Sequence, residues 1–230
     1  MTTNKRAIAL AVLTAALGLI PRANATLSKA ATFDDKVTNS AAIILGKAVK
    51  QEAKWDANHR WILTYTTFKI EKSYKGLDGQ QEITVVTPGG QVGDVHQETI
   101  GIPEFVEGKD QVLFIRNTSA GPTVTFFDQG AYDVAKNGND RVVTPVATEA
   151  VHVDTQRGMA VASEEPRTLN QFENAVRESE RRTSFNRMEV IKQQKQVKTP
   201  SFTSTLLRYK YLVLLALIGV AIATWQLMRR

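Results

Sequence analysis

Apolar and polar residues alternate along much of the chain between residues 41 and 145, the pattern of half-buried β-strands. In the segment 61–72, one face of such a strand carries Trp61, Leu63 and Tyr65, and the other face carries Thr64 and Phe68. Apolar runs at 43–45 and 111–115 indicate strands that are covered on both faces. The pattern predicts strands at 41–53, 61–72, 83–86, 111–115, 123–127, 131–135 and 141–144.

Turn-forming residues separate these strands. Asp56-Ala57-Asn58 joins the first two into a predicted hairpin, and Asn137-Gly138 is typical of a type I′ turn because both residues tolerate a positive φ. No helical segments alternate with the strands, so parallel β-α-β units are not expected. The fold class predicted for the body is therefore all-β, a barrel or a sandwich.

Two helix starts flank this body. Thr32 before Asp34-Asp35 is typical of an N-cap followed by acidic residues in the first turn, which explains the adjacent carboxylates without catalysis. Thr168 and Gln171 have capping-box spacing, and the helix that they open has a short apolar stripe that can pack on the body. The sequence therefore predicts one flanking helix after the strands.

The two ends of the chain carry uncharged apolar segments. Lys5-Arg6, the apolar run 7–20 and Ala23-Asn24-Ala25 together form the pattern of a secretory signal peptide that is cleaved after Ala25. The segment from Tyr211 to Met228 is eighteen residues without a charge, about 27 Å of helix, which is enough to cross a bilayer. We expect a retained single-pass anchor with the body outside the cytoplasm and the tail Arg229-Arg230 inside, although cleaved bacterial sorting tails look similar.

The predicted domains follow from these segments. They are a signal peptide (1–25), a β-barrel domain (26–165), a helix with a basic tether (166–207) and a transmembrane anchor with a cytoplasmic Arg-Arg tail (208–230). The formal net charge is +6, but residues 26–165 hold 14 basic and 19 acidic residues, whereas 166–207 hold 8 and 4. Because nucleic-acid-binding domains concentrate basic residues on the folded surface, a nucleic-acid partner is not expected. The chain has no cysteine, which excludes disulfides and thiolate metal sites.

Several short motifs follow one another along the chain. In order they are Ile44-Leu45-Gly46-Lys47-Ala48-Val49, Tyr65-Thr66 with Lys75-Gly76, Thr87-Pro88-Gly89-Gly90, and Gly101-Ile102-Pro103-Glu104-Phe105-Val106-Glu107-Gly108. Together with Gln129-Gly130, Val134, Leu169 and Phe172, this series resembles a widespread and mostly uncharacterised bacterial secreted β domain. The resemblance covers about residues 33–178. It implies an OB-like barrel similar to that of the tissue inhibitors of metalloproteases, and it implies an extracytoplasmic location.

This chain departs from that family at two points. Lys109 stands where the family usually has a glutamate after Gly108, which weakens any role for that carboxylate. The chain also lacks the amino-terminal cysteine with which metalloprotease inhibitors chelate zinc. The resemblance therefore implies a fold and a compartment rather than an activity.

The segment 88–105 combines glycines and prolines that restrict or release the backbone, and we interpret it as a shaped loop. It is the predicted binding region of the body. The candidate binding residues are Gly89, Gly90, Asp94, Pro103 and Phe105.

Residues that could carry chemistry are few and scattered. His59, His96 and His152 have no metal-binding spacing, and a site that joins His96 and His152 to Asp94 or Asp154 would have to be assembled by the fold. There is no Gly-x-Ser-x-Gly motif and no cysteine nucleophile. We predict no catalytic residue, no metal and no cofactor, with a metal-dependent enzyme or a protease inhibitor that uses loop 88–105 as the alternative.

Two further surfaces are candidates for binding. Trp55, Trp61, Tyr65 and Tyr74 flank the first hairpin, where they could bind a glycan or simply pack in the core. The predicted tether carries basic residues that either lie against anionic headgroups or only keep an exposed helix soluble. The tether residues are Arg181, Arg182, Arg187, Lys192 and Lys195.

The sequence as a whole predicts a membrane-anchored, non-enzymatic module that binds a protein partner in the cell envelope. Gly219 and Ala223 have the spacing of a close helix contact, which is a weak indication of a homodimer.

Overall fold

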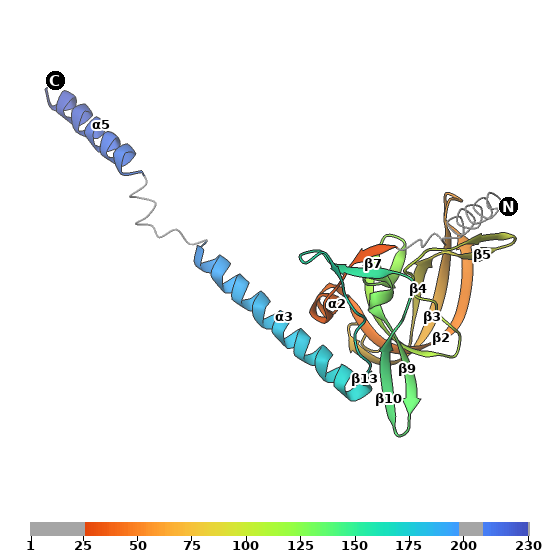
Figure 1. The fold of residues 1–230 in the computed structure, drawn as a ribbon. Helices are drawn as coiled ribbons and strands as arrows, with labels where there is room; N and C mark the ends of the chain where they lie inside the picture. Colours follow the sequence, from red (N-terminus) through yellow and green to blue (C-terminus); the bar gives the residue numbers. More distant parts are fainter. Residues whose placement is uncertain (1–25, 198–208, 230) are drawn as a thin grey trace, which may run out of the picture. The chain divides into compact units, whose positions relative to one another are not determined.

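The computed structural model describes residues 26–197 and 209–229, without the side chains of 193–197 and 213 (Figure 1). The predicted signal peptide lies outside these residues. The chain divides into two units at Ser179 and Glu180, and each is described separately below. The first contains all the strands, and the second is helical in its described part.

An eight-stranded antiparallel sheet forms the body. Its strands follow the order β13-β10-β9-β7-β2-β3-β4, and β8 pairs with β7. The bounds are β2 (Ala42–Trp55), β3 (Ile62–Lys75), β4 (Glu82–Pro88), β7 (Asp110–Thr118), β8 (Gly121–Val124), β9 (Ala131–Asn137), β10 (Asp140–Pro145) and β13 (Arg167–Thr168). The prediction of a mostly β body is confirmed. No ladder joins the two ends of the sheet within the described residues, so the body is β-rich without a hydrogen-bonded closed barrel.

Strand β7 is the centre of this sheet. It pairs with β2 along one edge, while its other edge pairs first with β9 and then with β8. Its residues Val112, Leu113, Phe114 and Ile115 are at most 1% exposed, which is what a strand covered on both faces requires. The apolar run at 111–115 therefore identified the central strand.

Alternate residues of β2 and β7 contribute to two cores. Leu45 and Phe114 belong to one apolar cluster, and Ile44 and Leu113 belong to the other, because successive side chains of a strand point to opposite faces. Helix α2 (Phe33–Asn39) and the start of helix α3 (Leu169–Val197) cover the first cluster (Figure 1). The second cluster lies inside the curl of the sheet and includes residues of β3, β4 and β8.

Local capping explains where both helices begin. Thr32 and Asp35 form a capping box at α2, with the Asp35 backbone N–H donating to Thr32 Oγ1 over 3.1 Å. At α3 the Thr168 backbone N–H donates to Gln171 Oε1 over 3.0 Å, and the Gln171 N–H donates back to Thr168 Oγ1 over 3.3 Å. Both predicted helix starts are confirmed.

The predicted strand 123–127 is wrong beyond Val124. Phe126 and Phe127 both have left-handed backbones, with φ of 56° and 57°, and residues Phe127–Gly130 form the 3-10 helix η1. Left-handed geometry is costly for a bulky residue and interrupts a strand at once. The Cβ of an alanine in place of Gly130 would lie 2.1 Å from the Thr125 carbonyl oxygen, so the chain can fold back this tightly only at a glycine.

Two small sheets lie outside the main one. Strand β1 (Leu27–Lys29) pairs in parallel with β11 (Val151–Asp154), which also pairs with β12 (Met159–Ala160). Strands β5 (Gly90–Val92) and β6 (Val95–Gln97) form a hairpin inside loop 88–105. The sequence pattern did not predict any of these five short strands.

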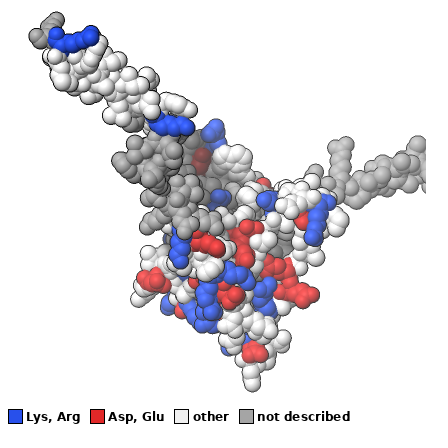
Figure 2. All heavy atoms as spheres, turned by 90° about the vertical axis from the view of Figure 1, so that its left-hand side faces the viewer, with Lys and Arg blue, Asp and Glu red and all other residues white. Residues whose placement is uncertain are grey.

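In the second unit, helix α5 (Lys210–Met228) has 19 residues and is long and apolar enough to cross a membrane. Figure 2 shows it as an uncharged cylinder with basic residues at its two ends. The coarse prediction of one apolar carboxy-terminal helix is confirmed.

Candidate functional site: a cleft beneath loop 88–105

Loop 88–105 is held to the start of β3 by its first residues. The Gly89 backbone N–H donates to the Ile62 carbonyl over 2.8 Å, and Gln97 Oε1 accepts from the Ile62 N–H over 2.6 Å. Gly90 has a φ of +131°, and a Cβ there would lie 2.4 Å from Thr64 Oγ1. Only glycine fits this position without displacing Thr64, so the β5–β6 hairpin can start here because residue 90 has no Cβ.

The end of the loop is anchored in the core. Phe105 is 6% exposed and meets Phe68 edge to face, with 5.0 Å between the ring centroids. The Phe105 carbonyl accepts a 2.6 Å hydrogen bond from Gln51 Nε2 on β2. The loop is therefore fixed at both ends.

Between the loop and the segment after β10 lies a cleft of about 660 Å³. Gln51, Thr64 and Thr87 contribute to it from the main sheet, and residues 96–105 and 146–149 form its walls. This volume is within the range of ordinary ligand sites, and the contributing strand residues are polar. The cleft can therefore hold a polar ligand or part of an extended peptide.

The charge of the cleft has one sign. Its lining includes the carboxylates of Glu98, Glu104 and Glu149, whereas it includes no lysine and no arginine. Carboxylates gathered around a polar concavity attract cations from solution.

The structure brings four of the five candidate loop residues to this cleft: Gly89, Gly90, Pro103 and Phe105 all line it. Gly89 and Gly90 shape the backbone, and Phe105 supplies core packing. Asp94 is exposed in the β5–β6 turn and does not line the cleft. The three glutamates and Thr148 also line the cleft, and none of them is among the five predicted binding residues.

A buried carboxylate lies next to the cleft. Asp128 in η1 is 3% exposed, and its backbone N–H donates to the carbonyl of the lining residue Gly101 over 3.1 Å. The hydroxyl of Thr148, another lining residue, donates to Asp128 Oδ2. On its other side Asp128 Oδ2 lies 3.3 Å from His152 Nε2, and His152 Nδ1 lies 2.7 Å from Ser28 Oγ.

These contacts link Ser28, His152 and Asp128 in one chain of hydrogen bonds. In the tautomer that donates Nε2–H to Asp128, His152 Nδ1 accepts from the Ser28 hydroxyl. A hydroxyl, an imidazole and an orienting carboxylate in series are the elements of nucleophilic catalysis. The same contacts also fasten β1 to the body, since Ser28 and His152 are register partners in the β1–β11 pair.

A metal site that joins His96 and His152 to Asp94 or Asp154 was the alternative suggested by the sequence. In the structure His152 contacts Ser28 and Asp128 instead, and among the described residues no three His, Asp or Glu side chains are placed to hold a metal ion. The residues 28, 128 and 152 are far apart in the sequence, and no local motif marks them.

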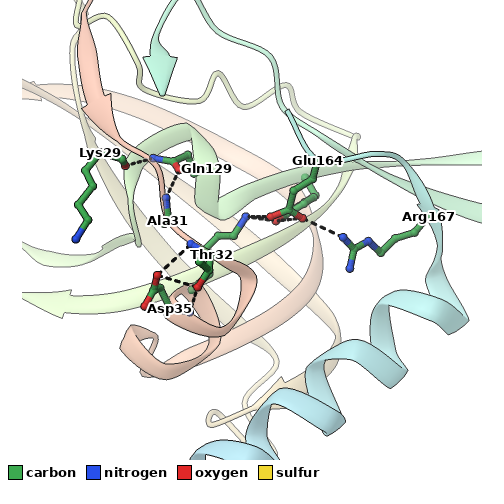
Figure 3. Close-up of polar contacts among 9 residues, drawn as sticks. Lys29, Ala31, Thr32, Asp35, Gln129, Glu164 and Arg167 are labelled. Carbon is green, nitrogen blue, oxygen red and sulfur yellow. Dashed lines mark hydrogen bonds and ion pairs between the residues drawn. The ribbon is translucent and has the colours of Figure 1, made fainter. Parts of the chain in front are cut away.

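Figure 3 shows two further groups of polar contacts near β1 and α2. Gln129 clamps the chain after β1, because its Oε1 accepts from the Ala31 N–H over 2.8 Å and its Nε2 donates to the Lys29 carbonyl over 3.1 Å. Beside it, the Lys36 ammonium donates to Tyr132 Oη over 2.6 Å and forms an ion pair with Glu164. Burial lowers the pKa of Lys36, and the neighbouring Glu164 opposes that shift.

The aromatic residues of the first hairpin divide between surface and core. Trp61 is 55% exposed, and Trp55 stacks on His59 with 6.3 Å between the ring centroids. Tyr74 instead packs on Phe172 below the sheet. Any glycan surface would therefore be limited to the Trp55–Trp61 end of the hairpin.

Four of the five predicted tether residues, Arg181, Arg182, Arg187 and Lys192, are exposed on α3. The side chain of Lys195 lies outside the described part of the structure. Gly219 lies on α5 with no other part of the described chain within 4 Å of where its Cβ would be.

The chain matches no protein-family model, no curated protein and no solved structure.

Proposed function

We propose that this chain is a single-pass membrane protein of the cell envelope whose β-domain binds a positively charged segment of a partner protein in the cleft beneath loop 88–105. The observation that carries the proposal is the lining of the cleft, three carboxylates with no lysine or arginine. A lysine or arginine side chain entering this cleft would meet three exposed carboxylates of opposite charge, and several such charges together attract a cation more strongly than a single surface pair does.

Binding to the purified full-length protein in detergent tests this proposal. A fluorescent ten-residue peptide of alternating arginine and glycine should bind, and its glutamate–glycine counterpart should not. The triple variant Glu98→Gln, Glu104→Gln, Glu149→Gln should weaken binding by about tenfold to a hundredfold, as expected for loss of partly exposed charge pairs. Asp94→Asn is the matched control, because it removes a carboxylate from the same loop outside the cleft. Equal losses in the triple variant and in the control would refute a role for the cleft.

The proposed topology places residues 26–207 outside the cytoplasm and α5 across the membrane. Its support is the uncharged length of α5 and the signal-peptide pattern at 1–25. Protease added to intact spheroplasts should digest the body and leave a membrane-bound fragment of about 2–3 kDa, the mass of a spanning helix of ~20 residues. A fully protected body, or a mature protein that still begins at Met1, would contradict this topology.

We also infer that the body is an OB-like barrel of the type suggested by the resemblance. The support is that Gly121 of β8 lies against Val86 of β4, where an added Cβ would be 3.1 Å from Val86 Cγ2. The two strands thus approach each other side by side, although no ladder joins them. An experimental structure compared with OB-fold domains tests this assignment.

A second candidate function, acyl transfer, is favoured by the Ser28–His152–Asp128 arrangement. Ser28 Oγ would attack an ester carbonyl and give its proton to His152 Nδ1, while Asp128 stabilises the imidazolium. The alcohol would leave with that proton, and water would release the acid and regenerate Ser28. A fluorophosphonate probe decides between the two functions: labelling lost in Ser28→Ala supports acyl transfer, whereas absence of labelling in the intact protein leaves binding alone.

A further inference from the structure

The exposed half of α3 carries a stripe of two apolar side chains flanked by two basic ones. Arg181, Phe185, Met188 and Lys192 are spaced by four, three and four residues, so they fall on one face of the helix. Phe185 is 63% exposed and Met188 is 56% exposed. We call these four residues the basic–apolar stripe.

The composition of the stripe limits what can cover it. Glu178 and Glu189 lie about 50° and 70° around the helix axis from the centre of the stripe, each three residues before one of its cations, and Glu180 lies about 110° away. Two copies of the stripe packed together would place cation against cation in either a parallel or an antiparallel pair, which is unfavourable. A surface that pairs with the two cations of the stripe is negative, and it also accepts an aromatic ring and a thioether.

The neighbouring helix indicates which surface this is. Helix α3 ends at Val197 and α5 begins at Lys210, so the stripe is joined by short chain to a helix that can cross a membrane. Even a fully extended connection keeps Lys192 within about 50 Å of the start of α5, given ~3.3–3.6 Å per residue. A bilayer headgroup region is negative where it contains anionic lipid, and it accepts aromatic and apolar side chains at its acyl boundary.

We infer that the basic–apolar stripe lies on the anionic surface of the bilayer that α5 spans, with Phe185 and Met188 inserted between the headgroups and Arg181 and Lys192 paired with lipid phosphates. This rests on the proposed membrane anchoring and adds to it the face of the helix that meets the lipid. It also gives the predicted tether residues unequal roles, because Arg182 and Arg187 lie off the stripe.

The expected affinity of the stripe for anionic lipid determines the conditions under which the contact forms. Each basic residue near an anionic surface strengthens association about fivefold, and each partly inserted apolar side chain strengthens it up to about tenfold. The four residues together give a factor of about 10³, which is weak for a free helix. Attachment to α5 raises the local concentration of lipid surface to the millimolar range or higher, so the contact forms at low salt. It should be lost near 1 M salt, where the Debye length is about 3 Å.

The absence of cysteine in the chain permits a clean test by single-cysteine labelling. The full-length protein carrying Met188→Cys, Val190→Cys or Ala216→Cys is labelled with a polarity-sensitive fluorophore. It is then reconstituted into vesicles of phosphatidylcholine with or without 30% phosphatidylglycerol and with brominated acyl chains as quenchers. Val190 is the matched control, because it is 52% exposed and lies on the opposite face of α3.

The label at 188 should be quenched and blue-shifted in the anionic vesicles, and the label at 190 should remain in water. Arg181→Gln with Lys192→Gln should reduce the association about 25-fold, and the pair Arg182→Gln with Arg187→Gln should change it less. Equal exposure of 188 and 190 to water, or equal quenching of 188 in purely zwitterionic vesicles, would overturn the inference. The label at 216 reports α5 separately: if it is not quenched, the membrane anchoring itself fails, whereas its quenching together with a water-exposed 188 refutes the stripe alone.

Discussion

The joint between α3 and the β-domain depends on one aromatic side chain, and its removal gives the sharpest stability prediction. Phe172 is fully buried. It meets the rings of Phe33, Phe114 and Tyr132 at centroid distances of 5.6, 5.9 and 5.5 Å. Phe172→Ala removes the group that these three rings share and leaves a cavity between α3 and the sheet.

The magnitude follows from the class of substitution. Buried Phe→Ala changes cost about 3–5 kcal/mol, a large part of the 5–15 kcal/mol that stabilises a typical domain. For a domain of this size, each kcal/mol lowers Tm by roughly 2–4 °C, so the variant should melt about 6–20 °C below the parent protein. Near-ultraviolet circular dichroism during urea and thermal unfolding measures this loss, because it reports the packed aromatic rings.

The same helix supplies the control. Phe185→Ala makes the identical chemical change at a position that is 63% exposed, and it should alter the free energy of unfolding by at most about 0.5 kcal/mol. If the two variants lose equal stability, or if Phe172→Ala loses less than about 1 kcal/mol, then α3 is not held to the body by this aromatic cluster.

Three other substitutions test single features of the structure by urea unfolding. Gly90→Ala should destabilise the domain more than Gly93→Ala, because an added Cβ meets Thr64 Oγ1 at 2.4 Å at position 90 and nothing within 4 Å at position 93; equal effects would contradict the tight approach. Ser179→Ala should stabilise by roughly 0.5–1.5 kcal/mol, since the buried Ser179 hydroxyl has no hydrogen-bond partner in the described residues and alanine favours helix; a loss would reveal a partner. Burial raises the pKa of Tyr74, and the nearby Glu173 carboxylate raises it further. The neutral Tyr74 side chain therefore makes its full contribution to the free energy of unfolding below the ordinary tyrosine pKa of 10.0, and this contribution is lost as the pH rises above that value. The stability of the parent should therefore fall more steeply than that of Tyr74→Phe between pH 10 and 11, and parallel curves would contradict the shift.

The parts of the fold that depend on local sequence were predictable. Alternation located β2 and β3, and the apolar run 111–115 located the central strand, because burial on one or both faces imposes a period that can be read directly. Thr32 and Thr168 marked their helices because a capping box is complete within four residues. The position of the loop that lines the cleft was also predictable, since its glycines and prolines are local signals.

The remainder depends on contacts between distant segments. The parallel pairing of β1 with β11 joins residues more than 120 positions apart, and nothing within Leu27–Lys29 specifies it. The left-handed backbone at Phe126 and Phe127 runs against the propensity of both residues, so tertiary packing must impose it. In the sequence the glutamates of the cleft looked like ordinary loop acids, because they have no motif in common and only the fold places them around one cleft.

Helix α3 also has a mechanical consequence. One continuous helix of 29 residues begins in the core and ends on the side of the chain that leads to α5. A pull on the carboxy-terminal end of α3 would therefore reach the β-domain through Leu169, Phe172 and Val176, the residues of α3 in the apolar cluster. Side-chain packing yields one turn after another under such a load, whereas the antiparallel ladders of the sheet resist together. The first element to yield under tension is then the amino-terminal part of α3, and the sheet with its cleft stays folded while that part of the helix peels away.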